Sequence, residues 1–146
     1  MRYLRAILSS LIILISTSCS APETSTNLTM EEAHQIVETF IAPYNLQPVN
    51  IRFGTDIPEN AMGATKCGAV SNTCEIVLHP CILNVNPHDA KNLVAHEAAH
   101  YVNAQINRIY DHGIEWKNLM RDQGWRPQEF YEESRSIINA CGEVDI

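Results

Sequence analysis

The sequence predicts an α+β domain in which a small sheet of about three strands packs against one long helix, with additional helices completing the core. Three observations support this fold class. Apolar residues recur at helical spacing over residues 33–41, and they alternate with polar residues over residues 49–53. A helix-capping residue, Asn86, begins a long segment that continues to about residue 108 and follows two more strand-like segments.

The first helix is expected to begin after Thr29. Thr29 and Glu32 have the spacing of a capping box, in which each side chain bonds the backbone N–H of the other residue. Pro43 is expected to end the helix, because proline cannot continue one. The stripe that this helix would bury consists of Ala33, Ile36, Val37, Phe40 and Ile41.

Three strands are expected to follow. The first runs from Val49 to Phe53, where apolar and polar residues alternate, and Gly54 stops it. The other two lie around residues 62–68 and 74–78. Ser71 and Asn72, between them, are turn residues, which favours an antiparallel hairpin.

The remaining segments are predicted to be helical. Asn86 is a suitable N-cap and Pro87 a suitable first residue for a long helix that continues to about residue 108. After a loop at residues 110–113, a short helix is expected to run to Gly124. A last helix would start at Pro127 and end at residues 141–142.

The N-terminus has the layout of a secretory signal of the lipoprotein type, residues 1–18. Arg2 and Arg5 precede an apolar stretch that is about half the length of a membrane-spanning helix. Cys19 follows small residues, which resembles a lipobox and predicts lipidation of Cys19; cleavage after Ala21 is the alternative. Residues 19–28 would form a flexible tether, and residues 29–146 the domain.

Four cysteines remain once Cys19 is set aside. An even number of cysteines in an exported chain predicts two disulfides. Three pairings are possible, and the favoured one joins Cys67 to Cys74 across the short hairpin and Cys81 to Cys141.

The charge balance argues against nucleic-acid binding. The chain has 10 Lys and Arg against 17 Asp and Glu, a net charge of −7. Removal of residues 1–18 would take away two arginines and no acidic residue, which leaves −9. Nucleic acid is therefore not an expected partner. The expected partners are a peptide or protein substrate and, through the N-terminal lipid anchor, a membrane.

The long predicted helix contains the sequence His-Glu-Ala-Ala-His at residues 96–100. Residues four apart lie one turn above each other on one helix face, so His96 and His100 can bind one metal ion. Glu97, one position on, need not bind the metal and can act as the general base towards a water molecule. This chemistry is that of a metal-activated water attacking a peptide carbonyl.

A catalytic zinc site normally has three protein ligands, so a third ligand is needed downstream. His112 is the favoured candidate, because Gly113 allows a sharp turn that would fold the short helix back against the long one. Glu115 and Asp111 are the alternatives.

Eleven residues separate His100 from the segment His112-Gly113-x-x-Trp116-Lys117, which is followed by Met120. With the pair His96 and His100, this segment resembles the SprT-like family of zincin metallopeptidases. The resemblance implies a zincin-like fold, one Zn²⁺ ion and His112 as the third zinc ligand. Better-known members act on proteins crosslinked to DNA, a substrate class that the acidity of this chain does not suit.

Together these features predict an exported zinc peptidase of the cell envelope or periplasm. The chain would be anchored to the membrane through Cys19, or secreted if that cysteine is not lipidated. The alternative is a zinc-binding envelope lipoprotein without catalytic activity. Glu97 favours the enzyme, because a purely binding site has no need of a glutamate at this position.

Overall fold

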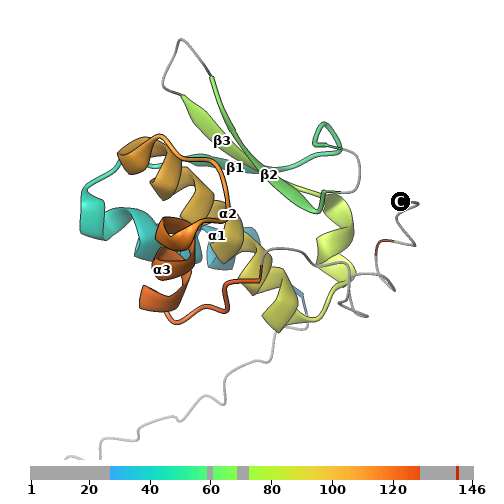
Figure 1. Cartoon of the computed structure of the whole chain (residues 1–146). Coiled ribbons are helices and arrows are strands. Elements are labelled where there is room, and N and C mark those ends of the chain that lie inside the picture. The colour runs from blue at the N-terminus through green and yellow to red at the C-terminus, as the bar shows by residue number, and fades with distance from the viewer. Residues whose placement is uncertain (1–26, 59–60, 69–72, 129–140, 142–146) are drawn as a thin grey trace, which may run out of the picture.

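The computed structural model describes residues 27–58, 61–68, 73–128 and 141. Its helices lie together on one side of a three-stranded sheet (Figure 1), which confirms the predicted α+β class. In chain order the elements are α1 (Met30–Ile41), η1 (Ala42–Tyr44), β1 (Asn50–Phe53), β2 (Gly63–Cys67), β3 (Cys74–Leu78), η2 (Pro80–Asn84), α2 (Pro87–Asn107) and α3 (Ile114–Asp122).

The predicted signal sequence, the site at Cys19, nearly all of the tether and most of the predicted last helix fall outside the described residues. Within the described ranges, no helix is both long and apolar enough to cross a bilayer.

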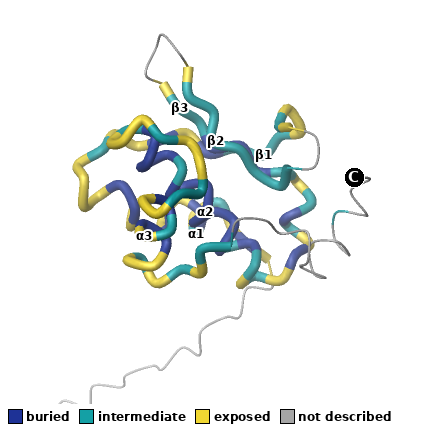
Figure 2. The backbone as a smooth tube through the Cα atoms, in the orientation of Figure 1, coloured by how far each residue is buried: buried dark blue, intermediate teal, exposed yellow. Residues whose placement is uncertain are grey.

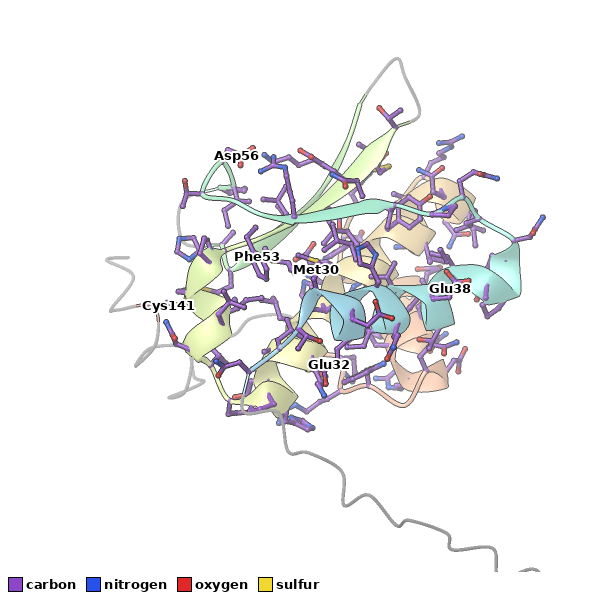
Figure 3. All side chains as sticks on the ribbon, turned by 180° about the vertical axis from the view of Figure 1, so that it is seen from behind. Met30, Glu32, Glu38, Phe53, Asp56 and Cys141 are labelled. Atoms are coloured by element: carbon purple, nitrogen blue, oxygen red, sulfur yellow. A yellow bond between two sulfur atoms is a disulfide. The ribbon has the colours of Figure 1, made fainter. Side chains whose placement is uncertain are left out.

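Helix α1 has the predicted capping box. Thr29 Oγ1 accepts a bond from the backbone N–H of Glu32 at 3.1 Å, and Glu32 Oε2 accepts one from the N–H of Thr29 at 3.0 Å. All five residues of the predicted stripe are buried. Glu32, labelled in Figure 3, also accepts a bond from Lys91 Nζ at 2.6 Å, which ties α1 to α2.

The sheet has the strand order β1-β3-β2. β2 and β3 pair antiparallel, which confirms the predicted hairpin, while β1 pairs parallel to β3. The central strand β3 ends with Ile76, Val77 and Leu78, which are all fully buried. A strand that is covered on both faces needs apolar residues at every position, so its sequence does not alternate. Cys67 lies opposite Cys74 in the hairpin, and the two form a disulfide.

Helix α2 is the centre of the fold. Asn86 Oδ1 caps its start by accepting a bond from the N–H of Asp89 at 2.9 Å, and its C-cap is Arg108, which has a left-handed φ of 58°. The helix packs against α1, α3, β2 and β3, and its central part is among the most buried in the molecule (Figure 2). A helix covered on several sides buries polar residues as well, and His96 and Glu97 are among them.

The second disulfide joins Cys81, in η2, to Cys141, which Figure 3 shows beside η2. Both disulfides are thus the predicted ones. Pro127 and Gln128 are not helical, so the described part of the chain does not begin a helix at Pro127. Instead the N–H of Gln128 donates to the carbonyl of Arg126 at 2.8 Å, which makes a three-residue turn around Pro127.

Candidate metal centre

Three histidines converge beside α2. His96 and His100 stand one turn apart on this helix, and His112 comes from the loop that precedes α3. The Nε2 atoms of His96 and His100 are 3.1 Å apart, those of His100 and His112 are 3.0 Å apart, and those of His96 and His112 are 3.1 Å apart. The three ligand atoms therefore form a nearly equilateral triangle.

The size of this triangle fits a zinc ion. Its centre lies about 1.8 Å from each nitrogen, close to the Zn–N bond length of about 2.0–2.1 Å. Three neutral imidazoles that point their lone pairs at one another repel, and a cation among them removes this repulsion. Three histidines are also a known ligand set of catalytic zinc, which keeps a fourth position open.

The protonation state of two of these histidines suits metal binding. Burial is the main reason why the pKa of His96 falls to about 4 and that of His100 to about 3, and the neighbouring histidines lower both pKa values further. Both imidazoles are consequently neutral at pH 7. The neutral form has the free nitrogen lone pair that a metal ion needs.

Trp116 packs against the three histidines, and Met120 lies one turn further along α3. Both side chains are fully buried. The ring centroid of Trp116 lies 4.7 Å from those of His96 and His112 and 5.5 Å from that of His100. Its Nε1–H donates to the backbone carbonyl of His96 at 3.3 Å. The indole thus holds the three imidazoles from one side.

Glu97 is buried against strand β2. Its Oε2 accepts a bond from Thr65 Oγ1 at 2.9 Å, and the same hydroxyl lies 2.8 Å from the backbone carbonyl of Glu97. Burial raises the pKa of Glu97 to about 7, against a smaller lowering by the bonds from Thr65. A carboxyl group with such a pKa can both accept and return a proton near neutral pH.

Gly63 allows β2 to approach Glu97 closely. A Cβ at this position would lie 3.0 Å from both Cγ and Oε1 of Glu97, closer than ordinary contact distance. Neither Gly63 nor Thr65 is predicted as a site residue from the sequence. No spacing rule connects them to Glu97, since only the packing of β2 on α2 brings them together.

Asp111 and Glu115, the alternative third ligands, are not part of the triangle. The converging group comprises His96, His100 and His112. Asp111 Oδ1 instead accepts a bond from the N–H of Gly113 at 2.8 Å and so supports the turn before α3. The structure therefore brings His112 to the pair.

His96 has a further partner on the other side of its ring. Its Nδ1 lies 3.0 Å from the backbone carbonyl of Gln128. A carbonyl oxygen only accepts hydrogen bonds, so Nδ1 carries the proton and Nε2 presents its lone pair to His100 and His112. Zinc-binding histidines commonly have such an orienting partner. Gln128 could not be identified from the sequence, because any residue type can supply a backbone carbonyl.

A second group of possible ligands in the described part of the chain consists of His79, Cys81 and Cys141. The two sulfur atoms are bonded to each other, and His79 Nδ1 accepts a bond from the N–H of Cys81 at 3.2 Å. This group therefore offers a metal ion no thiolate while the disulfide is intact.

Comparison with known proteins adds an independent finding. A sequence model of the SprT-like family matches residues 29–133, which include Glu97 and all three converging histidines. No curated protein matches the chain. The match covers most of the chain, and the fold and the arrangement of histidines are those that the resemblance implies. The chain therefore belongs to the SprT-like family.

Proposed function

We propose that this protein is a zinc-dependent peptidase. One observation carries the proposal: three Nε2 atoms lie within 3.1 Å of one another, and the residue that follows the first histidine is a buried glutamate with a pKa of about 7. The histidines supply a zinc-binding set, and the glutamate supplies a base that works near neutral pH.

Each residue of the site has a distinct task. When bound, zinc would lower the pKa of a water molecule and polarise the carbonyl of the peptide bond to be cleaved. Glu97 accepts the proton from the attacking water and returns it to the leaving amine. Thr65 holds the carboxylate through its hydroxyl, and Trp116 holds the imidazoles from below.

Strand β2 is suited to aligning the substrate. It is one of the two edge strands of the sheet, and its residue Thr65 contacts Glu97, so this strand runs beside the proposed base. An edge strand offers backbone N–H and C=O groups with which an extended peptide can pair. We therefore propose that unfolded or extended protein segments are the substrates.

The proposed location is the cell envelope, with the protein anchored through Cys19. Residues 1–19 support this in the sequence alone. The two disulfides support an oxidising compartment, since such bonds persist mainly in exported proteins. The net charge of −7 favours protein over nucleic-acid substrates.

The decisive experiment measures zinc content and peptidase activity in four proteins with intact disulfides: the parent, Glu97→Gln, His112→Ala and His88→Ala. His88 is a matched control, because it is on α2 as well but its side chain is 73% exposed. We expect one zinc per chain in the parent, Glu97→Gln and His88→Ala, and a clear loss in His112→Ala. Activity on an unfolded protein should fall by about 10²- to 10⁴-fold in Glu97→Gln.

A folded parent protein that retains no zinc would refute the metal site. Full activity in Glu97→Gln would refute the proposed role of Glu97, even if zinc were bound.

A further inference from the structure

A short segment after α3 contacts His96 on the side of its ring opposite the other two histidines. We call residues 125–128 the strap. Its first residue is fixed to α3, since the N–H of Trp125 donates to the carbonyl of Met120 at 2.8 Å. Its last residue, Gln128, provides the carbonyl that faces His96 Nδ1 at 3.0 Å. The strap thus connects α3 to a histidine of α2.

Asn92 fixes the middle of the strap. Its Oδ1 accepts a bond from the N–H of Arg126 at 3.2 Å, and its Nδ2 donates to the carbonyl of the same residue at 3.2 Å. Asn92 lies one turn before His96 on α2 and is only 1% exposed. A buried amide that makes both bonds to one backbone residue holds that residue in position and orientation.

The strap is stiff between Arg126 and Gln128. The ring of Pro127 fixes its own φ near −65° and disfavours the helical conformation for Arg126. The bond from the N–H of Gln128 to the carbonyl of Arg126, at 2.8 Å, closes a three-residue turn across this proline. Because this turn is stiff, holding Arg126 in place also determines where the carbonyl of Gln128 points.

That carbonyl selects one tautomer of His96. With the proton on Nδ1, the lone pair is on Nε2, which lies 3.1 Å from the Nε2 atoms of both His100 and His112. If the carbonyl moved away, the proton would be free to occupy either nitrogen and the ring would lose one of its restraints.

We propose that Asn92 is a positioning residue for the metal centre. Its amide holds the strap, the strap presents the carbonyl of Gln128, and the carbonyl orients His96 for metal binding. This inference rests on the proposed zinc site and adds to it the residue that prepares one ligand. Loss of such an indirect partner typically weakens metal affinity by about 10- to 100-fold.

The test compares zinc affinity, by competition with a chromophoric chelator, in the parent, Asn92→Leu and Asn103→Leu. Leucine has the same number of side-chain heavy atoms as asparagine and is branched at the same carbon, but it cannot form hydrogen bonds to the strap. Asn103 is a matched control, since it is a fully buried asparagine of α2 whose Oδ1 accepts a bond from Asn107 Nδ2 at 2.8 Å. We expect about 10- to 100-fold weaker zinc binding in Asn92→Leu and little change in Asn103→Leu.

A second variant protects the test against misfolding. Pro127→Gly leaves α2 and the core intact but loosens the turn, so zinc affinity should fall here as well, by less than in Asn92→Leu. Equal zinc affinity in the parent, Asn92→Leu and Pro127→Gly would overturn the proposal.

The tautomer of His96 gives a readout that needs neither zinc nor activity. In the zinc-free parent at neutral pH, ¹⁵N NMR of the imidazole should show the proton on Nδ1 of His96, and Asn92→Leu should show a mixture of tautomers. A parent that has this tautomer but binds no zinc would refute the proposed function and leave the role of Asn92 intact. An unchanged tautomer in folded Asn92→Leu would refute that role.

Discussion

Glu97 is a buried carboxylate: it is 4% exposed, and within the described residues its side chain accepts a hydrogen bond from the neutral hydroxyl of Thr65. Its hydrogen bond from Thr65 offsets only part of the cost of burial, so its pKa rises to about 7. The burial that raises the pKa of this proposed base therefore costs the protein stability. This trade-off can be measured in the zinc-free protein.

The first prediction concerns the pH dependence of that cost. The native pKa of Glu97, about 7, exceeds its ordinary value of 4.5, so the native state binds this proton more tightly than the unfolded state. The resulting stability is fully present below pH 4.5 and is lost as the pH rises through about 7. Glutamine cannot ionise. The free energy of unfolding of Glu97→Gln, relative to that of the parent, should therefore rise by about 2 to 3 kcal/mol between pH 5 and pH 8.

Urea unfolding of both zinc-free proteins at pH 5, 6.5 and 8 measures this difference. If the free energies of unfolding differ by the same amount at all three pH values, Glu97 does not have a raised pKa.

A second prediction concerns Gly63. In Gly63→Ala the new methyl group must displace the side chain of Glu97, because the Cβ would lie 3.0 Å from its Cγ and Oε1. A base that is moved by a fraction of an ångström works poorly, and we expect kcat to fall by up to about 100-fold. Zinc content should not change.

Ala64→Ser is the matched control, since Ala64 is on the other face of β2 and should tolerate a hydroxyl. Steady-state kinetics decide the matter, and equal kcat values for the Gly63→Ala variant and the parent would contradict the expectation.

At the scale of elements, α2 carries most of the site and its ends are well defined. Its start could be predicted from Asn86 and Pro87, because capping is a local property of the chain. The elements against which the helix packs could not be predicted in this way. Strand order depends on contacts between residues that are distant in sequence. The parallel pairing of β1 with β3 involves no tight turn, so no turn residues in the sequence indicate it.

The third prediction tests the cap of α2. Asn86→Ala removes the acceptor for the N–H of Asp89, and we expect the free energy of unfolding to fall by about 1 kcal/mol. Because His96 lies almost three turns further along, zinc affinity should remain that of the parent. Denaturant unfolding and a zinc titration measure the two effects, and weakened zinc binding without a loss of stability would contradict the prediction. His88→Ala, an exposed change in the same turn, is the control.

At the scale of the whole molecule, two covalent links reinforce a modest core. Cys67–Cys74 closes a local hairpin with a sequence separation of 7, whereas Cys81–Cys141 joins residues 60 positions apart. A link between distant residues restricts the unfolded chain more strongly. The second disulfide also ties Cys141 to η2, which lies directly before α2.

The fourth prediction compares the two links. Loop-closure entropy suggests a loss of about 4 kcal/mol for the double variant Cys81→Ser/Cys141→Ser and about 2.5 kcal/mol for Cys67→Ser/Cys74→Ser. Each double variant is the control for the other, because both remove two sulfur atoms. Thermal and urea unfolding should rank them in this order. A larger loss for the hairpin disulfide would show that local packing outweighs the entropy of the chain.

By itself, the sequence determined the capped helices, the hairpin, and the pair His96 and His100 with Glu97 beside them, because helix geometry relates residues that are near in the chain. Only the tertiary structure decided that His112 completes the triangle in place of Asp111 or Glu115. It alone brought Thr65 to Glu97 and the carbonyl of Gln128 to His96. These contacts join residues 12 to 32 positions apart, and packing of the whole chain, which no local pattern encodes, sets their geometry.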